Sequence, residues 1–175
     1  DQIISISEAT KADLINFFGI KEEKISVIYP GFDTALSKLQ KQKLNIIKEK
    51  FRLPEEYILY VGNIEPRKNI LNLAKAFNLL HENSSIEKEV HLLIVGQKGW
   101  FYKDIIEGIN ALKNKDKIKL VGPIYGENLA GIYQLAKVMA YPSMFEGFGY
   151  PILEAMRLGT PVLTSNVSSM PEAGG

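Results

Sequence analysis

Two glutamates, Glu146 and Glu154, flank a segment that passes from a loop into a helix. The loop 146–150 is rich in glycine and aromatic residues, and Pro151 opens a helix that ends at Gly159. Proline suits the first helical turn because its missing N–H would be unpaired there, and glycine permits a left-handed cap. The free N–H groups of a helix start favour an anion such as a phosphate. We therefore expect a sugar-nucleotide site, with the sugar near Glu146, the diphosphate at the helix start and the ribose near Glu154.

Positive charge gathers in the segment 62–69, which follows a predicted buried strand at 57–61. Arg67 and Lys68 are adjacent at the mouth of a helix, where two like charges gain nothing unless an anion is present. Arginine can grip a phosphate through two donors, and lysine adds a compact positive charge. Such a pair is often only a solvated surface feature, but its place at the ligand-binding end of a strand favours the anion-binding interpretation. Gly62 would let the backbone come close to the ligand.

Two further loops follow predicted buried strands. Gly96 comes after the strand 90–95, and two interpretations of it have equal weight: it gives room to a ligand, or it makes a tight turn. Ile124 lies in the segment 122–125, after the strand 117–121, where we expect a contact with a nucleobase.

Several nucleotide-binding and metal-binding patterns are absent from the sequence. There is no G-x-G-x-x-G, which disfavours a nicotinamide dehydrogenase, and no G-x-x-x-x-G-K-[ST] phosphate loop. No two aspartates are separated by one residue, so the usual carboxylate pair that holds a metal-bound nucleotide sugar is missing. We therefore expect no metal and no other cofactor, with Arg67, Lys68 and the helix start stabilising a departing diphosphate.

The segments that position these residues alternate between apolar strands and amphipathic helices. This alternation predicts an α/β fold, a Rossmann-like parallel sheet with helices on both faces. In such a sheet, ligands bind beyond the carboxyl ends of the strands, where the loops described above would meet. Strands are expected at 57–61, 90–95, 117–121, 138–141 and 161–164, and helices at 69–80, 101–112, 128–136 and 151–159.

The first 56 residues are organised differently. We expect a strand at 3–6, a helix from Ser7 to about Phe18, a strand at 24–29 and a lysine-rich helical arm at 35–52. The arm is either a solvated helix face, which we favour, or a basic surface for anionic lipid. We expect a single domain over 1–175, with this N-terminal part (1–56) and a core of β/α repeats (57–175). The last residues look like the start of an unfinished helix, so we expect the natural protein to be longer.

Composition limits the class of protein. The chain has 175 residues, of which 46% are apolar and 23% charged, as in an ordinary soluble globular protein. A net charge of +1 gives no argument for a nucleic-acid partner. The absence of cysteine fits a reducing compartment, and we find neither a signal peptide nor an apolar run that could span a bilayer. We expect a cytoplasmic protein, with peripheral contact to the inner face of the membrane left open.

Taken together, the motifs resemble the carboxyl-terminal, donor-binding half of a GT-B glycosyltransferase of retaining family 4, the glycosyl transferases group 1. Glu146 and Glu154 have the E-x7-E spacing of that family. This spacing becomes specific together with the glycine-aromatic loop, Pro151 and the Arg-Lys segment. The resemblance covers nearly the whole chain and rests on residues 5–7, 29–33, 61–69, 142–149, 154–156, 159–162 and 171–172.

The resemblance implies a role for several residues. Glu146 would hold a hydroxyl of the donor sugar, Glu154 would bind the ribose hydroxyls, and Lys68 would neutralise the leaving diphosphate. Many relatives carry an arginine where this chain has Asn63, and we expect Arg67 to substitute for it in part. The backbone of the loop would meet the sugar and the diphosphate, through Gly147, Phe148, Gly149 and Tyr150.

The resemblance implies a metal-independent, retaining transfer from a nucleotide-diphosphate sugar to a polysaccharide or a lipid-linked glycan. The mannosyltransferase-like form of the segment 65–69 makes GDP-mannose our first donor and a UDP-sugar the next. The family's acceptor domain has no counterpart in the chain, so we expect weak donor binding and little or no transfer. Two alternatives stay open: a sugar-nucleotide epimerase or synthase of GT-B architecture, and a nucleotide-binding module without catalysis.

Overall fold

The computed structural model describes residues 1–31, 36–84, 86–87 and 89–175. Its largest part is a five-stranded parallel sheet with the strand order β5-β4-β3-β6-β7. The predicted Rossmann-like α/β fold is therefore confirmed. The strands are β3 (Glu56–Val61), β4 (Val90–Val95), β5 (Ile118–Gly122), β6 (Val138–Tyr141) and β7 (Val162–Thr164).

The centre of this sheet is buried on both faces, as the near-continuous apolar runs of its strands require. Leu59 of β3 lies opposite Leu93 of β4 on one side and Met139 of β6 on the other. All three side chains are fully buried. This layer forms the core of the protein and holds the carboxyl ends of β3, β4 and β6 side by side.

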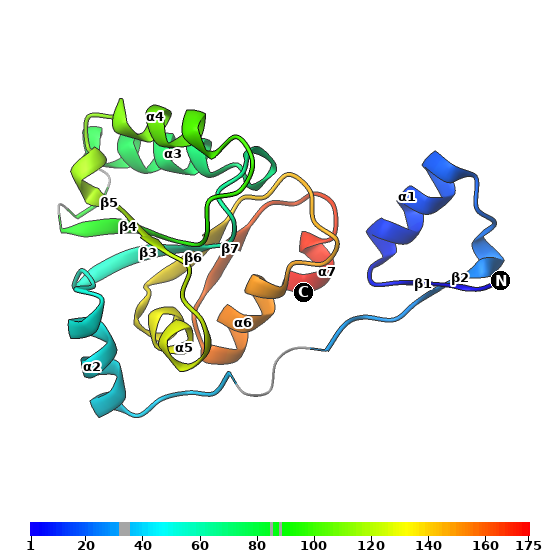
Figure 1. Ribbon diagram of the computed structural model, residues 1–175, viewed down its shortest axis with the longest axis horizontal. Coiled ribbons are helices and arrows are strands. Elements are labelled where there is room, and N and C mark those ends of the chain that lie inside the picture. The colour runs from blue at the N-terminus through cyan, green and yellow to red at the C-terminus, as the bar shows by residue number, and fades with distance from the viewer. Residues whose placement is uncertain (32–35, 85, 88) are drawn as a thin grey trace.

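Helices cover both faces of the sheet (Figure 1). On one face lie α3 (Ile70–Glu82) and α4 (Tyr102–Asn110), and on the other α5 (Gly126–Leu135) and α6 (Tyr150–Leu158). The short helix α7 (Met170–Gly174) follows β7. Three 3-10 turns complete the connections: η1 (Glu22–Lys24), η2 (Pro66–Lys68) and η3 (Lys115–Lys117).

The predicted helical arm at 35–52 is wrong in its first part. The helix α2 covers only Lys41–Lys50, and residues 36–40 run along the core without helical structure. Their backbone is held by core side chains, because Gln134 accepts from the N–H of Leu39 and Arg157 donates to the carbonyl of Leu36. In α2, Ile47 is buried against the core. Ala35 lies outside the described residues.

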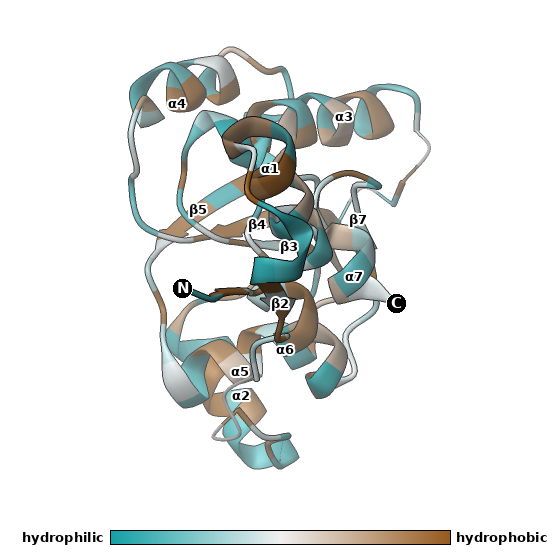
Figure 2. Ribbon diagram, turned by 90° about the vertical axis from the view of Figure 1, so that its right-hand side faces the viewer, coloured by the Kyte–Doolittle hydropathy of each residue, from teal (hydrophilic) through white to brown (hydrophobic). Residues whose placement is uncertain are grey.

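The N-terminal residues form a separate small unit of β1 (Ile3–Ser5), α1 (Glu8–Phe18) and β2 (Ile25–Val27). In the part of the chain that the structure describes, its two parallel strands pair with each other and with no strand of the core sheet. The predicted helix start is confirmed, because the Ser7 hydroxyl accepts from the Thr10 N–H at 3.0 Å. We refer to residues 1–31 as the N-terminal unit; Figure 2, seen from its side, shows α1 in front of the core sheet. Phe32 and Asp33 of the predicted 29–33 motif lie outside the described residues.

Candidate functional site

Two adjoining cavities lie at the edge of the sheet where the strands have their carboxyl ends. We call the cavity of about 360 Å³ beside Glu146 the Glu146 cavity. We call the cavity of about 300 Å³ beside Glu154 the Glu154 cavity. Both are lined by Gly62, Asn63, Tyr150 and Pro151, so one elongated ligand could occupy the two together.

Glu146 is 7% exposed and accepts hydrogen bonds at both carboxylate oxygens. Its Oε1 pairs with the ammonium of Lys68 and accepts from Tyr141 Oη at 2.8 Å and Ser143 Oγ at 2.7 Å. Its Oε2 is 2.9 Å from Arg67 Nη1. Lys68 also lies 3.0 Å from Tyr141 Oη. The structure thus brings the predicted Arg-Lys pair and the first glutamate together, because η2 and the loop after β6 follow neighbouring strands.

Arg67 braces the loop that carries Glu146. One guanidinium nitrogen lies 2.8 Å from the carbonyl oxygen of Phe145 as well as contacting Glu146, and the other lies 2.8 Å from Glu65 Oε1. The side chain lines neither cavity. Its position therefore gives no support to the prediction that Arg67 replaces the arginine missing at Asn63.

Two serines that the sequence did not single out hold the backbone of the same loop. Ser168 Oγ donates to the Glu146 carbonyl at 2.9 Å and accepts from the Glu146 N–H at 3.2 Å. Ser169 Oγ lies 3.0 Å from the carbonyls of both Glu146 and Phe148. Ser168 adopts a left-handed backbone (φ 53°), which is uncommon for residues other than glycine. Both serines follow β7, which ends at Thr164, and they lie 22 and 23 residues from Glu146, so no local spacing links them to it.

The charge of Glu146 is favoured by its partners. Burial by itself raises the pKa of this carboxyl, but hydrogen bonds from Lys68, Ser143 and Arg67 outweigh burial and hold it below the ordinary value of 4.5. Burial and the neighbouring Glu146 carboxylate raise the pKa of the Tyr141 hydroxyl, which therefore stays a neutral donor. Glu146 is accordingly ionised at neutral pH.

The lowered pKa predicts a pH dependence of stability. Because the folded-state pKa is depressed, the Glu146 charge stabilises the fold fully above its unfolded pKa of about 4.3, and this stabilisation is lost as pH falls through the folded-state pKa. Urea unfolding between about pH 6 and about pH 3 should therefore show a steeper loss of unfolding free energy for the wild type than for Glu146→Gln. Parallel curves for the two proteins would contradict this.

The Glu154 cavity joins the loops after β3, β4 and β5 with the start of α6. Glu154 is held by Tyr133, whose hydroxyl lies 2.7 Å from Glu154 Oε2. Ile124 lines this cavity, as expected from its place after β5, and so does Gly96, for which a place beside a ligand was one of two equal interpretations. Pro123 and Tyr125, from the same predicted segment 122–125 as Ile124, line it too, together with residues not named as contacts: Val61, Val95, Gln97, Leu129 and Pro151.

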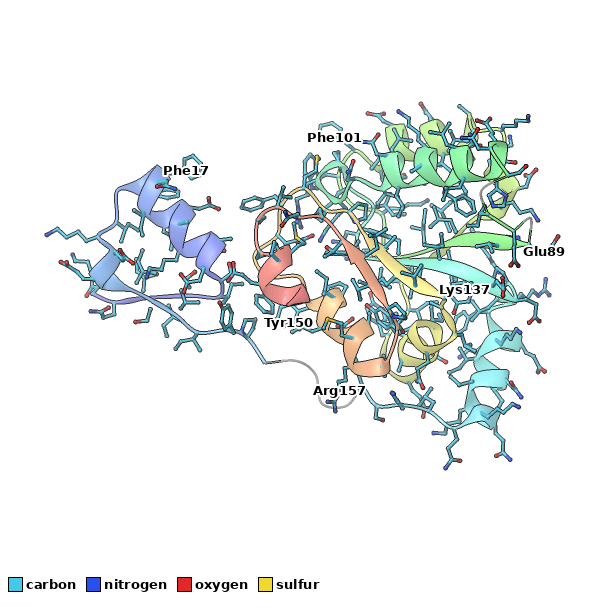
Figure 3. The ribbon with its side chains drawn as sticks, turned by 180° about the vertical axis from the view of Figure 1, so that it is seen from behind. Phe17, Glu89, Phe101, Lys137, Tyr150 and Arg157 are labelled. Atoms are coloured by element: carbon cyan, nitrogen blue, oxygen red, sulfur yellow. The ribbon has the colours of Figure 1, made fainter. Side chains whose placement is uncertain are left out.

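The start of α6 offers fewer N–H groups than the sequence suggested. Tyr150 is its first residue, and the side chain lies on the side of the core that faces the N-terminal unit (Figure 3). Pro151 has no N–H, and the Ile152 N–H already donates to the Gly149 carbonyl at 3.0 Å. Gly149 has φ 111°, a conformation open chiefly to glycine. A phosphate at this point would therefore meet the loop backbone of 147–150 rather than the first helical turn.

The N-terminal unit supplies one wall of the Glu146 cavity. Ile6, at the end of β1, lines it together with Gly147, Phe148, Gly149 and Tyr150. A Cβ atom added to Gly147 would lie 3.2 Å from Ile6 Cδ1, so the two segments are in close contact. Of the predicted site residues, all except Arg67 line one or both cavities.

Comparison with known proteins identifies the family. Residues 41–174 match the model described as Glycosyl transferases group 1. The chain belongs to this family. Residues 1–36 match a second model, Glycosyltransferase Family 4, and residues 37–40, between β2 and α2, belong to neither match.

Several relatives of this group 1 chain are named glycosyltransferases. It is 31% identical over 174 residues to the O-antigen chain mannosyltransferase B of Escherichia coli, and the aligned region covers 99% of this chain and 45% of the relative. It is 29% identical over 181 residues to the D-inositol 3-phosphate glycosyltransferase of Thermobifida fusca, and the aligned region covers 99% of this chain and 41% of that relative. The chain thus spans less than half the length of these curated relatives.

Solved structures of the same fold include the Anabaena protein HepE in complex with UDP and glucose. It superposes with a TM-score of 0.84 at 22% identity, over 98% of this chain and 46% of HepE, a likeness that shows the fold alone. Within the described residues of the group 1 chain, no helix is both long and apolar enough to cross a membrane. No cluster of three or more His, Asp or Glu side chains in that part of the chain could hold a metal ion.

Proposed function

We propose that this chain is the donor-binding part of a glycosyltransferase and takes a nucleotide-diphosphate sugar across the two adjoining cavities. The observation that carries the proposal is the continuity of the Glu146 cavity with the Glu154 cavity through Gly62, Asn63, Tyr150 and Pro151. A sugar at one end and a nucleoside at the other would span this groove, with the diphosphate at the shared residues.

In this arrangement each end of the groove has a distinct chemistry. Glu146, fixed by its donors, presents a carboxylate to the sugar hydroxyls. Glu154 presents one to the ribose hydroxyls, and the apolar surface around Ile124 receives the base. Lys68 lines the Glu146 cavity and places a positive charge where a leaving diphosphate develops negative charge.

We further propose a metal-independent, retaining transfer, in which the basic segment acts where other enzymes use a metal ion. GDP-mannose is the first donor to test, supported by the relative named as a mannosyltransferase, and UDP-glucose the second, supported by the HepE complex. The acceptor we propose for the whole protein is a polysaccharide or a lipid-linked glycan, made at or near the inner face of the membrane.

The first test is a thermal-shift and calorimetry screen of this chain against GDP, UDP, ADP and dTDP, and against their mannose or glucose derivatives. We expect at least one nucleoside diphosphate and its sugar to raise the unfolding temperature. The absence of binding by all of them at millimolar concentration would overturn the proposal.

The ribose contact gives a sharper test. Glu154→Gln should weaken binding of the nucleoside diphosphate by roughly tenfold, because hydrogen bonds to a charged group contribute about 1.5–3 kcal/mol. The matched control is Glu55→Gln, a glutamate that pairs with Lys48 at the opposite end of the sheet. If calorimetry finds that both variants bind the nucleoside diphosphate with wild-type affinity, Glu154 does not contact the ligand.

A further inference from the structure

Glu172 of α7 joins the two ends of the chain. Its Oε2 accepts from the Glu8 N–H at 2.7 Å, and its Oε1 accepts from the Ala9 N–H at 2.9 Å. Glu8 and Ala9 are the first residues of α1, where N–H groups have no acceptor inside their own helix. A carboxylate is favoured at this end of a helix dipole. The contact therefore satisfies two otherwise unpaired donors with one side chain of the core.

The N-terminal unit also touches the loop that follows Glu146. Thr10 Oγ1 lies 3.4 Å from the Gly147 carbonyl, and the rings of Tyr29 and Phe148 are 5.7 Å apart. Ile6 packs against Gly147 and lines the Glu146 cavity. The contacts of this unit thus fall on the wall of the cavity itself.

The segment 168–172 also contacts this loop, through hydrogen bonds to its backbone. Ser168 and Ser169 hold the Glu146 carbonyl, and Glu172 lies one helical turn further along. Figure 1 and Figure 3 show α7 on the side of the core that faces the N-terminal unit. One short segment therefore fixes the Glu146 loop at one end and the start of α1 at the other.

We infer that Glu172 is a positioning residue, which holds the start of α1 against the core so that Ile6 closes the sugar end of the cavity. The inference rests on the proposed donor-binding function. Among the described residues the two sheets share no strand pairing, so side-chain contacts such as the bridge from Glu172 hold the N-terminal unit in place. Loss of the bridge should open the sugar end of the groove and leave the nucleoside end, at Glu154, unchanged.

Amide hydrogen exchange tests the bridge directly. In the wild type we expect protection at Glu8 and Ala9, and in Glu172→Ala we expect that protection to be lost. Thr10 is an internal reference, because its N–H is held by Ser7 and not by Glu172. Glu8 and Ala9 amides that exchange equally fast in the wild type and in Glu172→Ala would overturn the bridge.

Paired binding measurements test the positioning role. Calorimetry measures the affinity of each variant for GDP-mannose and for GDP, and likewise for UDP-glucose and for UDP. Glu172→Ala should lower the affinity for the nucleotide sugar by roughly three- to tenfold while leaving the nucleoside diphosphate unchanged. Glu172→Gln, which keeps one acceptor oxygen, should restore part of the sugar preference. The control Glu22→Gln removes an ion pair to Lys11 within the N-terminal unit and should leave both affinities at wild-type values.

The outcomes separate the two proposals. An equal loss of affinity for nucleotide sugar and nucleoside diphosphate would make Glu172 merely structural and overturn its positioning role. If the wild type binds neither, the donor-binding function fails and the positioning role with it, while the exchange experiment still decides whether the bridge exists.

Discussion

The Glu146→Ala variant should lose about 3 kcal/mol of unfolding free energy, because it leaves the Lys68 ammonium buried without its anion. Lys68 is 7% exposed, and its partners within the site are Glu146 and the Tyr141 hydroxyl. Removing one partner of a buried ion pair costs about 3–5 kcal/mol. The lower end applies because the Tyr141 oxygen still accepts from the ammonium.

The reverse substitution should be milder. In Lys68→Met, the Glu146 carboxylate keeps donors from Arg67, Tyr141 and Ser143, so its charge stays compensated. The double variant Glu146→Ala/Lys68→Met should regain much of the stability lost in Glu146→Ala, because no unpaired charge is left. Urea unfolding of the four proteins at pH 7 gives the coupling energy of the pair. Strictly additive effects would show that the two groups are not coupled.

The two single variants should also differ in ligand binding. Under the proposed function, Glu146→Ala removes a sugar contact and should bring the affinity for GDP-mannose or UDP-glucose down to that of the nucleoside diphosphate. Lys68→Met removes positive charge near the diphosphate and should weaken both classes of ligand. Calorimetry on the folded variants distinguishes these patterns. A loss of the preference for the nucleotide sugar in Lys68→Met and not in Glu146→Ala would show that the sugar lies elsewhere.

The meeting of Lys68 with Glu146 could be predicted because each follows a buried parallel strand. Parallel strands place their carboxyl ends at one edge, so loops far apart in sequence converge there. The strand alternation at 57–61 and 138–141 predicted that η2 and the Glu146 loop lie at the same edge, while the pairing of β3 with β6, which makes them neighbours, came from the structure. The same reasoning placed Ile124 at this edge, where it lines the Glu154 cavity, and left Gly96, which also lines it, between two equal interpretations.

Contacts made outside that regular sheet could not be predicted in this way. Nothing in the local pattern links Glu172 to Glu8, or Ile6 to Gly147, because these contacts depend on how the N-terminal unit sits against the core. Arg67 shows a different limit: its side chain lies beside Glu146, as its loop position suggested, but it pairs with both Glu65 and Glu146 and lines neither cavity. Residue type and loop position therefore pointed to the residues that line the two cavities, while the direction of individual side chains required the structure.

The helical arm was misjudged for a related reason. Lysine, leucine and glutamine favour a helix, but residues 36–40 instead gain core contacts for Leu36 and backbone hydrogen bonds from Arg157 and to Gln134. Propensity is a weak preference that such tertiary contacts override. The remaining helix, α2, buries Ile47 against Gly131, where an added Cβ would lie 2.5 Å from Ile47 Cδ1 and would make that side chain shift.

The sequence left two interpretations of Gly96 equal, room for a ligand or a tight turn, and the structure adds a third reason for a glycine at this position. A Cβ atom there would lie 1.9 Å from the Gly62 carbonyl oxygen and 2.7 Å from the Gly62 carbonyl carbon. These are backbone atoms, held in place because the Gly62 N–H donates to the Val95 carbonyl at 2.9 Å. Gly96 is therefore required by the close approach of the loops after β3 and β4, and it also lines the Glu154 cavity.

Gly96→Ala should accordingly lower the unfolding free energy by about 3 kcal/mol or more, the upper end of the range for overpacking, because one of the two loops must move. Moving Gly62 and Asn63 would alter both cavities, so binding of the nucleoside diphosphate should also be lost in protein that remains folded. Two controls separate the clash from backbone strain. Gly31→Ala meets nothing within 4 Å and should be close to neutral, whereas Gly126→Ala has open space but φ 58° and should lose about 1–2 kcal/mol from strain alone. Urea unfolding that ranks Gly96→Ala with either control would show that the loops can separate freely, and the shared wall of the two cavities would then not be fixed by the sheet.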